Sequence, residues 1–172
     1  IGDSVFANCP KLVKVTFNSG VNEVGSFVFD MPSAIKDVYV NDLVSYLGIK
    51  FSEEFYGGQY SNPTRFAENI YVNGKILKNL VIPEGVTRIS NYAFYGCESL
   101  ETVKFPSTLK EIGGGAFAYC SNLKDFTLPE SLEIIGESAF CSCSSITKLE
   151  LKKNVKDETQ QEQTNVYKMG TF

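Results

Sequence analysis

The stretch Ile89-Ser-Asn-Tyr-Ala-Phe94-Tyr-Gly-Cys97 decides how this 172-residue chain folds, because it occurs three times. The second copy is Ile112-Gly-Gly-Gly-Ala-Phe117-Ala-Tyr-Cys120, and the third is Ile135-Gly-Glu-Ser-Ala-Phe140-Cys-Ser-Cys143. The copies align without a gap, and the interval between their first positions is constant at 23 (112 − 89 and 135 − 112). A fixed period of this size is typical of proteins that stack one short unit many times.

The unit continues past each cysteine with the pattern Leu-x-x-Val-x-Phe or a close variant, at residues 100–105, 123–128 and 146–151. An earlier pair of units, residues 1–17 and 24–40, keeps the same spacing of 23. The last two apolar residues of the pattern share one face of an extended segment, so the pattern predicts a β-strand. Where proline follows, the strand ends, because proline cannot donate to a ladder.

Each unit is therefore expected to form one coil of a solenoid, whose apolar face is buried only by the coils above and below it. The strands should pair in parallel, because every coil runs the same way round. The Ala-Phe-x-x-Cys segment is too short for a regular helix, so we expect a helical turn or a piece of 3₁₀-helix there. Equivalent side chains should stack as ladders of phenylalanine and cysteine: Phe94, Phe117, Phe140, Cys97, Cys120 and Cys143.

The spacing breaks between Val24 and Ile89, whose positions differ by 65 (89 − 24). Removing one regular interval leaves 42 (65 − 23), which is enough for about two coils with a modified middle. Residues 41–47 suggest a short helix capped by Asn41 or Asp42. The region is therefore expected to be a variant coil that carries an excursion, rather than a separate domain.

Within the excursion, residues 52–66 are loop-like, and residues 70–77 predict a β-hairpin because Asn73-Gly74 suits a type I′ turn. We expect one domain over residues 1–155, with regular coils at 1–40 and 77–155 and a variant coil at about 41–76. Residues 156–172 are polar and are expected to form a tail or linker, although their few apolar residues could instead fold back as a cap.

The unit Ile-Gly-x-x-Ala-Phe-x-x-Cys-x-x-Leu-x-x-Val-x-Phe-Pro-x-x-Leu-x-x-Ile resembles the BspA-like class of leucine-rich repeats. The resemblance covers residues 1–40 and 77–155 closely, and residues 61–83 look like an insert of the same family. It implies a leucine-rich-repeat solenoid with a parallel β-sheet on one face, short turns or 3₁₀ segments on the other, and few helices. It also implies a secreted or surface-displayed protein, in several cases one that adheres to host proteins or cells, with no catalytic residues to carry over.

Composition argues against several functions. A net charge of −4 gives no attraction for nucleic acid, and no apolar run approaches the roughly 20 residues that cross a bilayer. The absence of histidine removes Ser-His and Cys-His nucleophile pairs. A zinc site at Cys141-Ser142-Cys143 would need distant thiols or carboxylates to complete its roughly four ligands, so we interpret the cysteines as small buried residues at a tight turn. Paired carboxylates such as Asp125 or Glu150 remain a catalytic alternative, but we expect them on an open face where charge is solvated. No enzyme activity and no cofactor are therefore expected.

Two further motifs have simple structural interpretations. Gly113-Gly114-Gly115 lacks the Lys-Ser/Thr of a phosphate-binding loop and aligns with variable corners of the coil. Five cysteines, an odd number, do not form a complete disulfide framework and leave the redox compartment open. Of these, Cys141 falls at a variable position and is expected to carry the most exposed thiol.

The strand positions between the buried ones should point outward and form a candidate binding face. They are Lys14, Thr16, Asp37, Tyr39, Asn79, Val81, Thr102, Lys104, Asp125, Thr127, Lys148 and Glu150, with Asn18 and Asn41 at strand ends. The excursion supplies a second candidate through its aromatic residues, which could instead close the groove left by a missing regular coil. These are Tyr46, Phe51, Phe55, Tyr56, Tyr60 and Phe66.

The sequence favours a non-catalytic interaction module of an extracellular or cell-surface protein, which binds an unidentified protein or glycan. Its export signal and anchor are expected to lie outside these residues. A structural spacer that carries another domain is the alternative, and an intracellular adaptor with reduced thiols is a third hypothesis.

Overall fold

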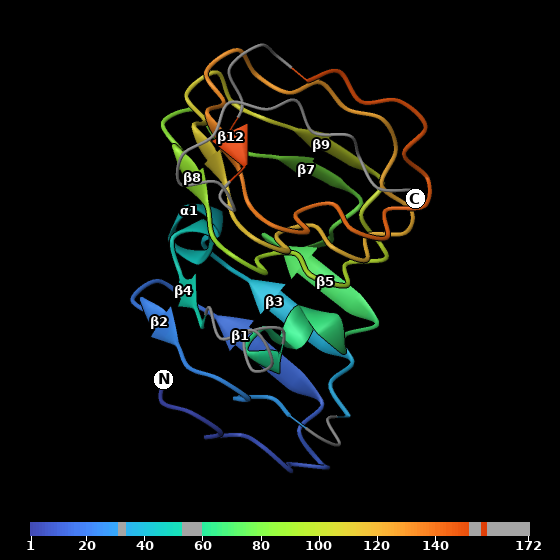
Figure 1. Cartoon of the computed structure of the whole chain (residues 1–172). Coiled ribbons are helices and arrows are strands. Elements are labelled where there is room, and N and C mark those ends of the chain that lie inside the picture. Colours follow the sequence, from blue (N-terminus) through green and yellow to red (C-terminus); the bar gives the residue numbers. More distant parts are fainter. Residues whose placement is uncertain (31–33, 53–59, 152–155, 158–172) are drawn as a thin grey trace.

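The computed structural model describes residues 1–30, 34–52, 60–151 and 156–157. Its coils stack along one axis, with the N-terminus in the lowest coil of Figure 1 and the later repeats above it. A regular coil passes through an extended segment, a run of turns and a short strand of two residues. The predicted solenoid of parallel strands with few helices is confirmed.

The first row of strands carries the residues that were predicted to form the binding face. In the lower coils, β1 (Lys14–Phe17), β3 (Asp37–Val40) and β5 (Asn69–Val72) pair in parallel. In the upper coils, β7 (Asn79–Val81) pairs in parallel with β9 (Thr102–Lys104). Between these two groups β6 (Lys75–Ile76) runs antiparallel to β5, so the row is divided into two sheets.

A second row of strands was not predicted. The strands β2 (Glu23–Val24) and β4 (Lys50–Phe51) pair in parallel in the lower coils. The upper coils contribute β8 (Arg88–Ile89), β10 (Glu111–Ile112), β11 (Ile134–Ile135) and β12 (Lys156–Asp157). The sequence interpretation placed only a corner here, because two residues are too few for an alternating pattern. The two residues of β12 were assigned to the polar tail, and the rest of that tail lies outside the described residues.

The turn side forms short turns, one of the two predicted alternatives, rather than pieces of 3₁₀-helix. Backbone bonds over three residues do form, for example from Ala93 N to Ser90 O (3.3 Å) and from Cys97 N to Phe94 O (3.0 Å). They do not join into a 3₁₀-helix, because Tyr92 and Gly96 adopt left-handed φ angles of 57° and 73°. Within the described ranges, 3₁₀ structure is found at η2 (Pro63–Arg65).

Left-handed residues recur with the same period as the sequence. Ser4 and Phe27, which occupy equivalent places in the first two coils, have φ angles of 56° and 55°. Tyr92, Gly115 and Ser138 occupy equivalent places in the upper coils, with φ angles of 57°, 59° and 56°. Each of these five coils thus needs a conformation that costs a non-glycine residue roughly 1–2 kcal/mol. Gly115 of the triple-glycine corner avoids that cost, which supports its interpretation as a corner of the coil.

The predicted phenylalanine ladder is present in the core. The ring centroids of Phe94 and Phe117 lie 5.3 Å apart with the rings 17° from parallel. Phe117 and Phe140 are also separated by 5.3 Å, at 2°. Phe94 and Phe117 are fully buried, whereas Phe140 is partly buried near the last coil. Successive coils therefore share one elongated hydrophobic interior.

The variant coil contains the predicted helix and hairpin. Helix α1 (Leu43–Leu47) begins at Asp42, whose Oδ1 accepts from Ser45 N at 3.1 Å. Asn73 and Gly74 join β5 to β6 with φ angles of 50° and 75°, as a type I′ turn requires. Both predictions are confirmed, because cap and turn chemistry are local to the sequence.

Candidate functional site

The predicted binding face is largely exposed. Asp37 and Tyr39 are half-buried, and the other ten predicted residues are exposed. The parallel register of β1 and β3 places Lys14 beside Asp37 and Thr16 beside Tyr39. In the upper sheet, Asn79 lies beside Thr102 and Val81 beside Lys104. The face is thus divided between two sheets.

A stacked tyrosine pair forms the most ordered part of this face. The rings of Tyr39 and Tyr71 are 6° from parallel, with centroids 4.5 Å apart. Lys14 Nζ lies 4.1 Å from the centroid of Tyr39, a cation–π contact. The sequence interpretation missed Tyr71 because it treated residues 70–77 only as a hairpin. The signal was present, since Tyr71 has the same place in its strand as Tyr39.

Polar contacts hold the pair in place. Asn69 Nδ2 donates to Asp37 Oδ1 at 3.2 Å. Partial burial raises the pKa of Tyr71, and the negative charge of Asp37 raises that pKa further, so the phenol stays protonated as a donor. Ile76 lies opposite Tyr71 in the hairpin with 45% of its surface exposed. The tyrosine patch, as we name it, consists of Lys14, Asp37, Tyr39, Asn69, Tyr71 and Ile76.

In the last two coils, the Asp125 side chain binds the neighbouring backbone where two paired strands were predicted. Residues 125–128 and 148–151 do not form strands. Instead, the Asp125 carboxylate accepts from Thr147 N at 2.6 Å and from Lys148 N at 3.1 Å. These backbone hydrogen bonds lower the pKa of Asp125, with a smaller contribution from the Lys148 charge. Asp125 therefore remains ionised and structural. With Thr127, Lys148 and Glu150 it lines a shallow hollow.

The aromatic residues of the excursion divide into two groups. Tyr46 and Phe51 are buried in the core, which supports their interpretation as residues that close the coil. Tyr60 and Phe66 are half-buried, and the Arg65 guanidinium carbon lies 4.7 Å from the Tyr60 centroid. Phe55 and Tyr56 lie outside the described residues.

Buried side chains join the variant coil to the next coil. In regular coils a backbone N–H donates to a carbonyl one layer on, as from Tyr92 N to Gly114 O (2.9 Å). In the variant coil, Asn62 Nδ2 donates to Tyr92 O and to Ala93 O, both at 2.9 Å. Thr64 Oγ1 donates to Tyr95 O at 3.0 Å. Sequence reasoning treated this segment as loop, because such contacts have no periodic signal.

The cysteine ladder is also structural. Cys120 Sγ donates to Phe94 O at 3.2 Å, and Cys143 Sγ donates to Phe117 O at 3.1 Å. All five thiols are free. Burial raises the pKa of Cys97 to about 12 and that of Cys143 to about 11, which keeps both protonated near neutral pH. Cys141 is exposed, as predicted.

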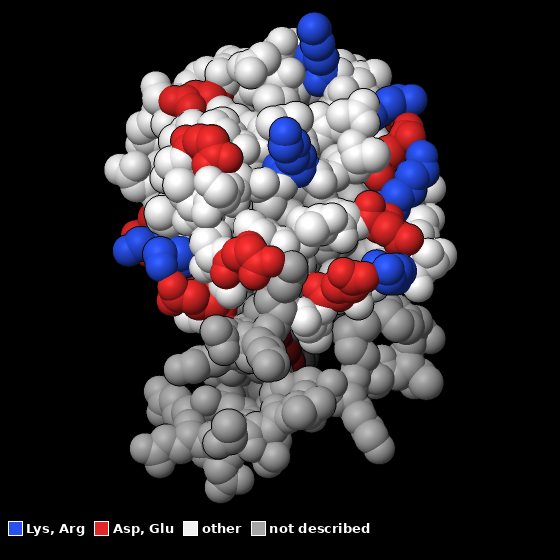
Figure 2. All heavy atoms as spheres, turned by 90° about the horizontal axis from the view of Figure 1, so that it is seen from above, with Lys and Arg blue, Asp and Glu red and all other residues white. Residues whose placement is uncertain are grey.

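The charged surface consists mainly of pairs between neighbouring coils. Arg88 Nε lies 2.6 Å from Glu111 Oε1, and Lys110 Nζ lies 2.5 Å from Glu133 Oε1. Figure 2 shows the two signs of charge interspersed at the upper end of the molecule. Exposed pairs such as Lys110–Glu133 contribute little to stability, and alternating charges create no extended field of one sign. Among the described residues, no helix has the length and apolar character of a membrane span.

The family model for the BspA type leucine rich repeat region matches residues 1–57 and 64–166, with six copies. Among solved structures, the chain is similar to a leucine-rich repeat protein from Bacteroides ovatus ATCC 8483. The two are 28% identical, the match covers 90% of this chain and 41% of that one, and the TM-score is 0.46. A leucine-rich repeat protein from T. pallidum is 26% identical over 79% of this chain and 57% of that one, with a TM-score of 0.42.

A leucine-rich cell surface protein from Faecalibacterium prausnitzii A2-165 is 18% identical over 94% of this chain and 64% of that one, with a TM-score of 0.34. The chain thus spans less than two thirds of each of these three proteins. No match was found among curated proteins. Because the family model matches most of the residues and the coils stack with the same period, the chain belongs to the BspA type leucine-rich repeat family.

Proposed function

We propose that this chain is a non-catalytic interaction module of a surface-displayed or secreted protein, and that it adheres to a host or cell-surface macromolecule through the tyrosine patch. The observation that carries the proposal is the stacked pair of Tyr39 and Tyr71 on the exposed face of the sheet. The repeat family is one of protein-interaction folds, and surface display is what the family resemblance implies.

Rigidity makes this pair suitable for binding. Tyrosine is enriched among the interface residues that contribute most to affinity. A side chain that is already held in one conformation loses little entropy when a partner binds. Lys14 lies against Tyr39, and the Asp37–Asn69 hydrogen bond lies beside the pair, so the neighbouring coils restrict both rings. Since the rings project from strands rather than from a loop, the scaffold fixes their spacing.

Among macromolecular partners, a protein suits the patch best. Tyr71 and the 45%-exposed Ile76 provide apolar contact area, while Asp37 and Lys14 provide one charge of each sign. An interface with an aromatic centre and a polar rim has this composition. Paired charges at the coil edges provide no basic surface for nucleic acid.

The proposal is tested by screening the chain against host matrix and cell-surface proteins with biolayer interferometry. For any protein that binds, the double variant Tyr39→Ala/Tyr71→Ala should weaken binding by at least about tenfold, as the loss of a central aromatic pair does. The matched control is Thr102→Ala/Lys104→Ala, which changes the same exposed face in the upper sheet. Equal affinity of the two variants, with both folded by circular dichroism, would contradict the proposed site.

A structural spacer is the second candidate. The observation that favours it is the continuous network between coils, which includes the phenylalanine ladder and the Arg88–Glu111 pair. Such a network stiffens a stack whether or not it binds anything. A screen in which no protein binds above a chain with a scrambled outer face would favour the spacer over the adhesion module.

A further inference from the structure

The second row of strands is interrupted at the variant coil. Strand β4 pairs with β2 and strand β8 pairs with β10, so β4 and β8 belong to different sheets. At this break the end of helix α1 contacts the next coil, because Ser90 N and Ser90 Oγ donate to Leu47 O at 3.2 and 2.7 Å. Beside this contact, residues of β2, β4 and β8 line a cleft of about 520 Å³.

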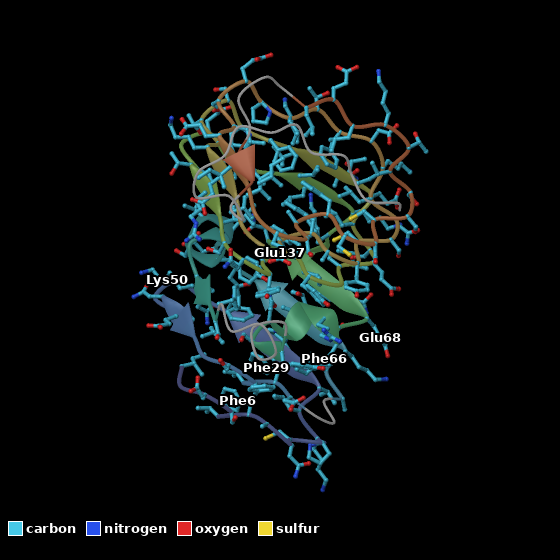
Figure 3. The ribbon with its side chains drawn as sticks, viewed as in Figure 1. Phe6, Phe29, Lys50, Phe66, Glu68 and Glu137 are labelled. Carbon is cyan, nitrogen blue, oxygen red and sulfur yellow. The ribbon has the colours of Figure 1, made fainter. Side chains whose placement is uncertain are left out.

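The cleft lies on a different side of the stack from the tyrosine patch. Figure 1 shows β2, β4 and β8 along the left edge of the view, whereas β1, β3 and β5 form the other row. In Figure 3, Lys50 marks the edge that carries the cleft, and Glu68, just before β5, lies at the opposite edge of the molecule. Of the described residues that line the cleft, none belongs to the tyrosine patch.

The polar groups of the cleft are held in fixed positions. Ser26 Oγ and Ser52 Oγ lie 2.6 Å apart, and Asp3 Oδ1 accepts from Ser26 N at 2.8 Å. Asn91 Oδ1 accepts from Gly114 N at 2.9 Å. A ligand in the cleft therefore meets hydroxyl, amide and carboxylate groups that lose little conformational entropy when it binds.

Charges of opposite sign balance within the cleft. Asp3 and Glu23 contribute two carboxylates to its lining, and Lys50 and Arg88 contribute two cations. Arg88 Nε also lies 2.6 Å from Glu111 Oε1, which offsets its positive charge. The two carboxylates of the lining disfavour a polyanion such as a nucleotide, and the two cations disfavour a polycation. The balance therefore favours an uncharged ligand.

Among uncharged ligands, a sugar fits the cleft best. Its volume lies in the range of small-molecule sites, but its lining is mainly polar, whereas sites for apolar ligands are lined mainly by hydrophobic side chains. Each hydroxyl of a pyranose both donates and accepts, so it can pair with a serine, a carboxylate or an ammonium group. Val24 and Phe51 supply the apolar part of the lining, which can contact the C–H face of the ring.

We propose that this cleft is a binding site for a neutral pyranose. The Asp3 carboxylate accepts hydrogen bonds from the hydroxyls of the sugar, and Lys50 and Ser52 donate to them. The site goes beyond the proposed function and does not depend on it, because the tyrosine patch lies elsewhere.

An NMR titration that follows the backbone amides of the chain tests the proposal. The probes are the methyl glycosides of glucose, galactose, mannose and N-acetylglucosamine, each added to about 20 mM, because a ligand this small binds with a Kd on the order of 1 mM. At least one glycoside should shift the amides of Ser26, Ser52 and Ser90 in a saturable manner. The absence of a saturable shift with every glycoside overturns the proposal. Stronger shifts of the same amides with sodium sulfate would assign the cleft to an anion and would overturn it as well.

Two variants test the named contacts. Ser52→Leu should abolish the shifts, because leucine removes the hydroxyl and fills the cleft. Its matched control is Ser107→Leu, which replaces an exposed serine whose Oγ donates to Glu84 Oε2 at 3.0 Å. Asp3→Asn keeps an acceptor for Ser26 N and should weaken binding about fivefold, since a hydrogen bond to a carboxylate is stronger than one to an amide. Binding that survives Ser52→Leu, or equal affinity of Asp3→Asn and the natural chain, contradicts the proposed site.

The double variant Tyr39→Ala/Tyr71→Ala separates this site from the tyrosine patch. It should bind the glycoside with the affinity of the natural chain, whether or not the patch binds a protein. Loss of sugar binding in this variant, with an unchanged circular dichroism spectrum, would place the sugar at the patch and overturn the proposal.

Discussion

Asn62 Nδ2 donates to the carbonyl oxygen of Ala93 over 2.9 Å and so joins the irregular coil to the regular stack above it. The same amide donates to the Tyr46 hydroxyl at 2.9 Å, and that hydroxyl donates to Ala93 O at 2.5 Å. Asn62 is fully buried. One side chain therefore satisfies several polar groups at the place where the backbone ladder between coils is interrupted.

Replacing Asn62 with alanine should destabilise the chain by about 2–3 kcal/mol, because the buried Thr64 N–H loses its acceptor, Asn62 Oδ1 at 3.0 Å, and the carbonyls of Tyr92 and Ala93 each lose one donor. Urea unfolding followed by circular dichroism measures the change. Asn122→Ala is the matched control, since Asn122 Nδ2 also donates to a carbonyl, that of Glu98, but at the exposed surface. Similar losses for the two variants would show that the buried contacts of Asn62 are not decisive.

The phenylalanine ladder should respond to truncation according to burial. Phe117→Ala removes a ring that is 0% exposed and stacked on both neighbours, and it should cost about 3–5 kcal/mol. Phe140→Ala should cost less, because Phe140 is only partly buried. Urea midpoints of the two variants test this order, and a larger loss for Phe140→Ala would contradict it.

The triple-glycine corner offers a steric test. A Cβ atom on Gly113 would lie 2.6 Å from Asn91 N and 2.9 Å from Ile89 O, both backbone atoms that cannot move freely. A Cβ atom on Gly114 meets nothing closer than 3.4 Å. Gly113→Ala should therefore destabilise the chain by about 1–3 kcal/mol and Gly114→Ala by much less. Thermal unfolding of the two variants distinguishes them. Equal melting temperatures would contradict the inference that Gly113 has no room for a side chain beside Asn91 and Ile89.

The buried thiols predict a loss of stability in alkali. Burial raises the pKa of Cys97 from 9.0 to about 12 and that of Cys143 from 9.0 to about 11. The unfolded chain therefore releases these protons at lower pH than the folded chain does. The contribution of these two thiols to the free energy of unfolding is fully present below pH 9. It is lost as pH rises through about 11 to 12, where the folded chain also loses these protons.

Urea unfolding of the natural chain and of Cys97→Ala between pH 8 and about 11 measures this linkage. The natural chain should lose more stability over that range than the variant does. Equal loss of stability with pH in the two chains would contradict the expected titration.

A maleimide reagent at neutral pH should label the exposed Cys141 long before Cys97, which is 1% exposed.

Much of the fold could be predicted because each coil repeats its contacts. The ladders at Phe94 and Cys120 follow from the period, and the cap at Asp42 follows from local chemistry. The short strands such as β10 could not be found, since two residues contain no alternation. Asp125 replaced a predicted strand because a carboxylate can bind backbone N–H groups in place of a carbonyl.

The candidate site was predicted only in part. Alternation identified Lys14, Asp37 and Tyr39 as outward-facing, and the structure places them together. Tyr71 was missed because the excursion lengthens the interval between paired strands, which is 39 − 16 = 23 for Thr16 and Tyr39 but 71 − 39 = 32 for Tyr39 and Tyr71. A search by fixed period cannot align a strand that is displaced in this way. The register of the strands, rather than the sequence interval, brings the two rings together.

The recurrence of left-handed residues at Tyr92, Gly115 and Ser138 has a consequence for how genes of this kind can change in length. Duplication or excision of a whole unit returns every strained residue, turn and buried ring to an equivalent place, so the new chain has the same contacts as the old. Loss of a single codon within a strand instead turns the following residues of that strand to the opposite face. Variation in the length of the regular array should therefore come in whole copies of the unit, whereas other lengths require an excursion such as that in the variant coil.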